Sequence, residues 1–207
     1  MTLARFAPAL ASICATVALS GCASLLVREP QADPQAIRAG AYALDEAHAA
    51  VLFKVTHLGL STFVGRFERL EASLDFDETD PTGATLEAII DMTSLDVAND
   101  DFAETLMGSG WFDAETYPQA VFRSTRIEKT SETTGKVHGD LTLRGVTKPM
   151  TLDVTFNGGA RNLLTTRYTL GFSASGTIDR TEFGLDRVAG FVGSDVVLEI
   201  HAEFARQ

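Results

Sequence analysis

Cysteine is scarce in this 207-residue chain, which has only two, and histidine is limited to four residues. Cys14 lies in an apolar N-terminal stretch, so removal of a signal peptide would leave Cys22 alone. An internal disulfide and a cysteine-rich metal site are therefore excluded. Basic residues are also few, because the chain has 17 Lys and Arg but 28 Asp and Glu, which gives a net charge of −11. A protein that follows nucleic-acid phosphates needs the opposite balance, so no nucleic-acid partner is expected.

The sequence motifs of common enzyme classes are absent as well. The chain contains no Gly-x-Ser-x-Gly elbow, no His-Glu-x-x-His pair, no phosphate-binding Gly-x-x-x-x-Gly-Lys and no dinucleotide-binding Gly-x-Gly-x-x-Gly. We therefore expect a protein that is not an enzyme and that carries neither a cofactor nor a metal ion.

Long apolar runs are missing too, and none reaches the roughly 20 residues that a membrane-spanning helix needs. The longest, residues 6–19, follows the single charge of Arg5 and is typical of a secretory signal peptide. Leu-Ser-Gly-Cys at 19–22 resembles the lipobox of bacterial lipoproteins, in which the cysteine is acylated. An ordinary secretory signal with a stray cysteine is the alternative. The predicted organisation is a signal peptide over 1–21, acylated Cys22 with a flexible tether over 22–40, and a β-barrel domain over 41–207.

The residues after the cysteine bear on location. Ala23 stands where Asp would be a retention signal, as in lipoproteins that are sorted to the outer membrane. We expect a protein on the periplasmic side of the cell envelope, anchored in a membrane through Cys22. The outer membrane is preferred, and the inner membrane remains open.

From Tyr42 onward, apolar residues recur at every second position, which is the period of a strand with one apolar face. Two runs, 63–76 and 119–127, change phase once each, and a bulge near Glu68-Arg69 is predicted in the first. Eight long strands joined by short turns, with no βαβ pattern, favour an all-β fold that is either an antiparallel barrel or a sandwich. The runs with unbroken alternation are 51–55, 86–92, 137–143, 150–156, 170–178 and 196–204.

Turn residues separate the predicted strands, and one short helix interrupts them. Asn99 is expected to cap this helix and Gly108 to end it. The aromatic residues Trp111 and Phe112 follow, either as a plug in one end of the barrel or as a lip at a ligand entrance. Turns are predicted at 80–83, 134–135, 148–149 and 157–159.

The inward phase of the strands mixes small residues with large ones, which bears on whether the barrel is hollow. Small inward residues leave room, so a long narrow apolar cavity is one interpretation, and a barrel filled by its own side chains is the other. The small residues are Gly65, Ala88, Ala120, Gly139, Ala174 and Gly176. The predicted lumen residues are Val51, Phe53, Val55, His57, Phe67, Leu86, Ile90, Phe122, Leu141, Leu143, Leu152, Val154, Phe172, Leu198 and Ile200.

Histidine and arginine supply candidates for contacts with a polar head group. His57 shares the inward phase of its strand and His48 precedes that run; both are structural hydrogen-bonding residues, a conceivable metal pair, or head-group contacts at a barrel mouth. Arg144 and Arg180 either brace loops through ion pairs or bind the head group. The predicted entrance residues are His48, Trp111, Phe112, Arg144 and Arg180.

Several motifs together resemble the YceI-like family of lipocalin-shaped, polyisoprenoid-binding extracytoplasmic proteins. The resemblance spans about residues 42–204. Arg-Thr-Glu-Phe-Gly at 180–184 resembles the family's Arg-x-Asp-Phe-Gly element, with Glu182 where Asp is usual. The other motifs are Tyr-Ala-Leu-Asp at 42–45, Val-Leu-Phe-Lys-Val-Thr-His-Leu-Gly at 51–59, Gly-Arg-Phe at 65–67, Phe-Asp at 112–113, Tyr-Pro at 117–118 and Gly-Asp-Leu-Thr-Leu-Arg-Gly-Val-Thr-Lys-Pro at 139–149.

The resemblance implies an eight-stranded antiparallel lipocalin-like barrel with one short helix, whose lumen holds an isoprenoid chain such as a quinone or a polyprenyl lipid. Family members are typically soluble and periplasmic, so the lipobox departs from the pattern. The main hypothesis is a non-catalytic protein that binds, sequesters or transports a long linear apolar lipid. The alternatives are an enzyme acting on a lipid head group near His48 and His57, and a structural envelope module with a solid barrel. The identity of the lipid is open, because fatty acids would also fit, and so is the assembly state, a homodimer included.

Overall fold

The computed structural model describes residues 37–77 and 79–207. The predicted signal peptide, Cys22 and the first part of the predicted tether lie outside these residues. Within the described residues, no helix has the length and apolar character needed to cross a membrane.

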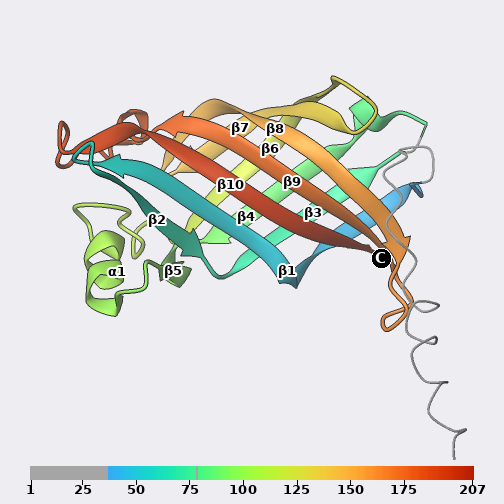
Figure 1. Ribbon diagram of the computed structural model, residues 1–207, viewed down its shortest axis with the longest axis horizontal. Coiled ribbons are helices and arrows are strands. Elements are labelled where there is room, and N and C mark those ends of the chain that lie inside the picture. Colours follow the sequence, from blue (N-terminus) through green and yellow to red (C-terminus); the bar gives the residue numbers. More distant parts are fainter. Residues whose placement is uncertain (1–36, 78) are drawn as a thin grey trace, which may run out of the picture.

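The strands form one antiparallel sheet that closes on itself (Figure 1). Pairing of β1 with β10 closes the ring. β2 and β3 pair with successive parts of β1, so they act as one strand and the barrel is eight-stranded, as predicted. The strands are β1 (Gly40–His57), β2 (Ser61–Phe67), β3 (Leu70–Phe76), β4 (Thr85–Asp91), β5 (Leu95–Asp96), β6 (Gln119–Lys129), β7 (Thr134–Leu143), β8 (Val146–Arg161), β9 (Tyr168–Asp179) and β10 (Val192–Arg206).

Both predicted changes of phase mark real irregularities. The chain leaves the ladder at Glu68 and Arg69, between β2 and β3. The backbone N–H groups of these two residues donate instead to Ser94 Oγ, at 3.2 and 3.0 Å. In β6 the register with β7 shifts between Ser124 and Arg126. A change of phase in the sequence therefore locates a bulge, because the extra residue turns the following side chains to the opposite face.

Three of the four predicted turns are wrong. Only 80–83 is a turn, and it contains the 3-10 helix Pro81–Gly83. Pro149 is accommodated inside β8 because the ladder of β8 with β9 begins only at Asp153. The other two misplaced turns are 134–135, which begins β7, and 157–159, where the register of β8 with β9 shifts.

The connection between β7 and β8 is a two-residue turn that was not predicted from the sequence. Arg144 and Gly145 have φ values of 52° and 75°, the left-handed conformation that a tight hairpin requires at both central positions. An arginine is uncommon in this conformation, so composition gave no signal for the turn.

The predicted helix is present as α1 (Asp100–Met107). Asn99 Oδ1 accepts the backbone N–H of Phe102 at 3.0 Å, which makes Asn99 the N-cap, and Gly108 is the C-cap. Leu106 is buried against the barrel. α1 and β5 lie at one end of the barrel, here called the α1 end (Figure 1). The opposite end, where β1 begins and β10 finishes, is called the termini end.

Candidate ligand-binding cavity

The barrel is hollow. Two cavities occupy its interior, an α1-end chamber of about 580 Å³ and a termini-end chamber of about 250 Å³. The two adjoin, because one ring of side chains from β1, β4, β7 and β10 lines both. This ring consists of Val51, Ile90, Leu141 and Leu198.

All fifteen predicted lumen residues line these chambers, four of them as members of the shared ring. That their side chains contact a ligand stays a prediction. Those in the α1-end chamber alone are Phe53, Val55, His57, Phe67 and Leu143. Those in the termini-end chamber alone are Leu86, Phe122, Leu152, Val154, Phe172 and Ile200.

Inward side chains halfway along the strands keep part of their accessible surface. Leu86, Ile90 and Leu198 point into the barrel and pack against the core, yet they are only partly buried. A packed interior would cover them completely, so the space beside them is empty. For the described residues, the interpretation of a barrel filled by its own side chains is wrong.

The prediction that small inward residues leave room for a ligand is nevertheless wrong for the glycines. A Cβ atom on Gly65 would lie 2.3 Å from the ring of Phe53, and one on Gly139 would lie 2.4 Å from the ring of Phe122. Gly176 is covered in the same way, by Met150 and Leu152. The glycines therefore make room for large neighbouring side chains and not for a ligand. Of the six small residues predicted to face inward, the three that line the chambers are Ala88, Ala120 and Ala174.

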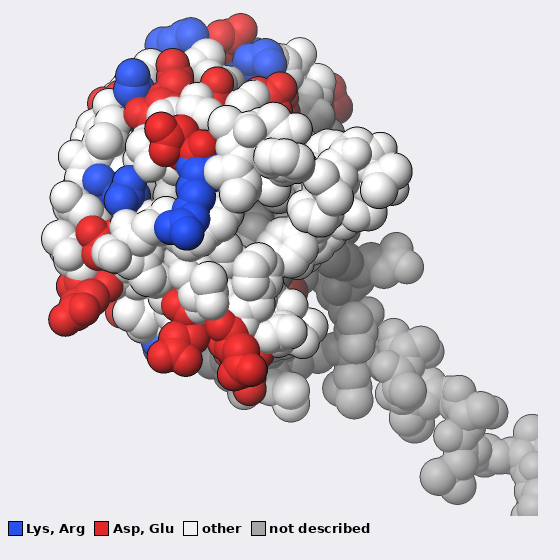
Figure 2. Space-filling model, turned by 90° about the vertical axis from the view of Figure 1, so that its left-hand side faces the viewer, with Lys and Arg blue, Asp and Glu red and all other residues white. Residues whose placement is uncertain are grey.

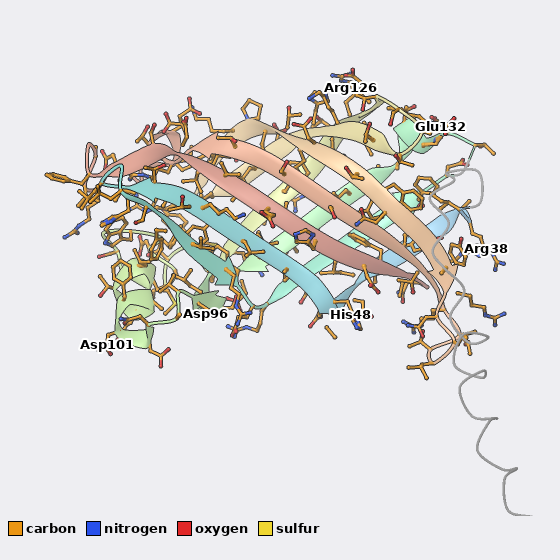
Figure 3. The ribbon with its side chains drawn as sticks, viewed as in Figure 1. Arg38, His48, Asp96, Asp101, Arg126 and Glu132 are labelled. Atoms are coloured by element: carbon orange, nitrogen blue, oxygen red, sulfur yellow. The ribbon has the colours of Figure 1, made fainter. Side chains whose placement is uncertain are left out.

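Polar groups are confined to the two ends of the tunnel. His57, Ser61 and Thr62 line the α1-end chamber where β1 turns into β2. Lys129, the last residue of β6, and Glu132, in the loop after it, line the other chamber at the termini end, where Figure 3 labels Glu132. The walls between are aliphatic and aromatic. This arrangement suits an elongated apolar molecule with a polar group at one end.

The aromatic residues after α1 close the α1 end and line its chamber at the same time. The ring of Phe112 lies 5.9 Å from the ring of Phe67 and 6.3 Å from that of Phe53, both in edge-to-face geometry. Trp111 also lines the chamber, and the Arg187 guanidinium lies 5.9 Å from the centre of its indole ring. Trp111 and Phe112 therefore form part of the chamber wall, and their role as a lip at a ligand entrance stays a prediction.

Exposed apolar side chains lie at the α1 end, in the neighbouring loops that follow β1 and precede β10. Leu60 is 85% exposed, Phe191 64% and Leu58 50%. The Leu58 N–H donates to the Phe191 carbonyl at 2.7 Å, which joins the β1–β2 loop to the loop before β10. Figure 2 views this end and shows a broad uncharged area beside acidic and basic groups. The three side chains are called the apolar rim.

Arg180 lines the α1-end chamber, but its side chain forms its hydrogen bonds with the segment before β10 and the start of that strand. The side chain is buried, and four of its five N–H groups donate to backbone carbonyls. Arg144 lines neither chamber and donates to the carbonyls of Gly184 at 2.7 Å and Ser109 at 3.0 Å. Bracing by ion pairs is therefore wrong, since the acceptors are carbonyls. Those of Arg180 are Gly193 at 2.8 Å, Val192 at 3.0 Å, Arg187 at 3.1 Å and Leu185.

His48 and His57 are not brought together, which corrects the prediction of a shared entrance. The ladder of β1 with β10 is interrupted between Leu44 and Ala49, and this bulge places His48 on the exposed outer surface (Figure 3). His57 lies nine positions after His48 along the strand, roughly 30 Å at the rise of a β-strand. Only His57 lines a chamber, so neither a metal pair nor a two-histidine catalytic site is formed.

The bulge holds a small polar cluster of its own. His48 Nδ1 lies 3.0 Å from Asp45 Oδ2, and Asp45, His48 and Glu203 offer ligand atoms within 4.8 Å of one another. The hydrogen bond with Asp45, with the charges of Asp45 and Glu203, raises the pKa of His48. Exposed acidic groups commonly have this spacing without an ion, so the cluster is interpreted as a stabilised bulge.

The closed strands and their internal tunnel define a hollow lipocalin-like barrel protein. Residues 42–204 match the family model described as "YceI-like domain", and the chain belongs to this family. A UPF0312 protein of Pseudomonas savastanoi is 34% identical over 146 residues, which cover 70% of this chain and 76% of the relative.

Solved structures agree with the fold. The crystal structure of BcnA from Burkholderia cenocepacia has a TM-score of 0.69 at 26% identity and covers 77% of this chain and 98% of its own. A polyisoprenoid binding domain from Saccharophagus degradans has a TM-score of 0.56 at 16% identity, with coverage of 82% and 100%. The second likeness shows the fold alone.

Proposed function

We propose that the protein binds a long, linear, apolar lipid whose chain runs through both chambers of the barrel. The observation that carries this proposal is the pair of adjoining cavities with apolar walls. The larger one, about 580 Å³, lies within the range of about 300–1,000 Å³ usual for small-molecule sites. A binding protein, not a catalyst, is the function that this geometry supports best.

Burial of the chain would supply the affinity. Each methylene group removed from water contributes about 0.8 kcal/mol, so roughly ten buried groups give about 8 kcal/mol before the costs of ordering. That gross energy corresponds to binding in the micromolar range. A narrow tunnel favours a single linear chain over bulky lipids. Among such chains an isoprenoid is proposed, because the motifs shared with the YceI-like family imply one, and a protein with the same fold is described as a polyisoprenoid binding domain.

The polar end of the lipid is proposed to lie at the α1 end. His57, Ser61 and Thr62 are the polar residues of that mouth, and the apolar rim would shield the chain as it enters. Arg180 has little left to offer a head group, because four of its N–H groups already have acceptors. His57 is therefore the preferred head-group contact.

Organic extraction of the purified protein, followed by mass spectrometry, tests the proposal. Val51→Phe narrows the ring shared by the chambers and should reduce retention of long chains. Leu52→Phe, at the next position of β1 and outside the shared ring, should leave retention unchanged. An extract without a chain lipid, together with no uptake of prenyl lipids, would contradict the proposal. Native mass spectrometry of the same samples reports the bound mass and the number of chains, including a homodimer.

We also propose that Cys22 is acylated and holds the barrel on the periplasmic side of the envelope, in the outer membrane. The support is the signal-like stretch over 6–19 and the lipobox-like sequence at 19–22. Labelled fatty acid should enter the wild-type chain and not Cys22→Ser, which should also leave the membrane fraction. Equal labelling of both chains would contradict the anchor. Separation of inner from outer membranes then shows which one holds the protein.

A further inference from the structure

Four arginines gather at the termini end of a chain whose net charge is −11. Together with Thr166, Tyr168 and Gln207 they surround one shallow depression. The Arg38 guanidinium lies 5.0 Å from the centre of the Tyr168 ring, and Figure 3 labels Arg38 at this end. The four residues, here called the arginine patch, are Arg38, Arg161, Arg167 and Arg206.

The charges of the arginine patch are not neutralised within the described part of the chain. No carboxylate there forms a salt bridge with any of the four, whereas several other exposed arginines each have one. Arg66 pairs with Asp96 at 2.8 Å, Arg69 with Asp91 at 2.9 Å and Arg123 with Glu87 at 2.6 Å. The patch is therefore a cluster of positive charges that is available to another molecule.

An apolar tip stands beside the patch. Leu163 and Leu164, in the loop between β8 and β9, are 56% and 95% exposed. The loop is ordered by its own hydrogen bonds, since Asn162 Oδ1 accepts the N–H of Leu164 at 2.9 Å and Arg161 Nε donates to the Thr166 carbonyl at 3.1 Å. The two leucines are thus held outward, with Arg161 and Arg167 on either side.

The rest of the chain joins the barrel at this same end. The described residues begin at Ile37, next to Arg38 of the patch, so the 36 preceding residues, Cys22 among them, connect here. Figure 1 shows the β8–β9 loop and the C-terminus together at this end of the barrel.

We propose that the termini end docks on an anionic phospholipid bilayer. The arginine patch would bind lipid phosphates through its planar, multiply donating guanidinium groups, and the two leucines would enter the interface between head groups and acyl chains. Basic residues flanking an exposed apolar tip match a phospholipid bilayer, which offers anionic phosphates directly above apolar acyl chains. Docking would turn the apolar rim away from the bilayer. The proposal is independent of what occupies the barrel.

Fluorescence quenching in vesicles tests the contact. The full-length chain carries Trp111→Phe, which removes its one tryptophan, and Leu164→Trp as a reporter. Vesicles of phosphatidylcholine with brominated acyl chains are prepared with and without phosphatidylglycerol. Residues 6–19 or an acylated Cys22 could bring the chain to any vesicle, so contact of the loop is measured and not sedimentation. We expect quenching in anionic vesicles only, and apparent binding weaker by about fivefold for each arginine removed in Arg161→Gln and Arg167→Gln.

Matched variants separate docking from general charge and from the opposite end. Arg66→Gln with Arg123→Gln removes the same charge elsewhere and should not change quenching. Leu60→Trp, on the apolar rim, should not be quenched. Equal quenching in neutral vesicles, quenching that survives loss of Arg161 and Arg167, or quenching of Leu60→Trp instead would each overturn the proposal. Quenching in no vesicle, as expected if the partner were an acidic protein, would overturn it too. Lipid extracted from the same variants reports on the lumen separately.

Discussion

At the scale of single residues, the interior depends on glycines that lie under aromatic rings. A Cβ atom on Gly139 would lie 2.4 Å from both the Phe122 ring and the backbone oxygen of Arg123. Gly139→Ala should therefore lower the free energy of unfolding by about 1–3 kcal/mol, because the backbone of β6 has to move. Gly171→Ala is the control, since its nearest atoms lie at 3.7 and 3.8 Å. Urea unfolding that shows equal losses for both variants would contradict this explanation.

The pH response of the β1 bulge is also a property of one residue. The hydrogen bond and charge of Asp45 raise the pKa of His48 in the folded protein. The protonated ring therefore favours the folded state. This contribution is complete below the unfolded pKa of about 6.5 and is lost as the pH rises through the higher folded pKa.

Asp45→Asn is expected to lower the pKa of His48 in an NMR titration. Asp153→Asn, which removes a carboxylate paired instead with Lys136, serves as the control. A His48 titration curve that Asp45→Asn leaves in place would show that Asp45 is not the cause.

Residue orientation was predictable, whereas the reach of each side chain was not. Alternation along β1 and β7 placed Val51 and Leu141 inside the barrel, because successive side chains of a strand point to opposite faces. Whether a glycine leaves a void depends on the rotamer of a residue on a neighbouring strand, as with Phe53 over Gly65. Such a contact between two strands cannot be predicted from the sequence of either strand alone.

At the scale of elements, α1 forms a wall of the chamber, and its cap controls how firmly that wall is held. Asn99→Ala removes the acceptor of the Phe102 N–H and should destabilise the helix by about 1 kcal/mol. Phe102 and Leu106 line the α1-end chamber, so transfer of bound lipid to acceptor vesicles should become faster. Asn99→Asp keeps an acceptor and should behave like the wild type. Lipid transfer equally fast in both variants would show that the cap does not gate the chamber.

Elements with a regular pattern could be predicted, and their connections could not. The strands, the bulge at 68–69 and the capped helix each leave a periodic or chemical signal. Proline and glycine do not distinguish a turn from a bulge or an unpaired strand edge, and therefore 148–149 and 157–159 were misplaced. The four-residue irregularity that moves His48 to the outer surface depends on the register with β10, which no local signal encodes.

At the scale of the whole molecule, the two ends of the tunnel differ, because the α1-end chamber is the larger one. The proposed head group lies at the α1 end, so the chain would cross the larger chamber first and end in the smaller one. Whether such a barrel is hollow is decided by the sum of many side-chain volumes around the ring. Small residues such as Ala174 can only suggest that outcome, because the same alternation fits a filled barrel.

The two chambers should affect lipid selection differently. Ala174→Leu fills part of the termini-end chamber, which only the tail of a long lipid reaches, so shorter chains should be preferred. Ala120→Leu fills part of the α1-end chamber, which every chain must cross, so chains of all lengths should bind more weakly. Ser175→Leu adds the same bulk at an exposed position of β9 and should change neither property. Mass spectrometry after loading with prenyl lipids of graded length measures the distribution. If Ala174→Leu weakened short and long chains alike, the lipid would not enter from the α1 end.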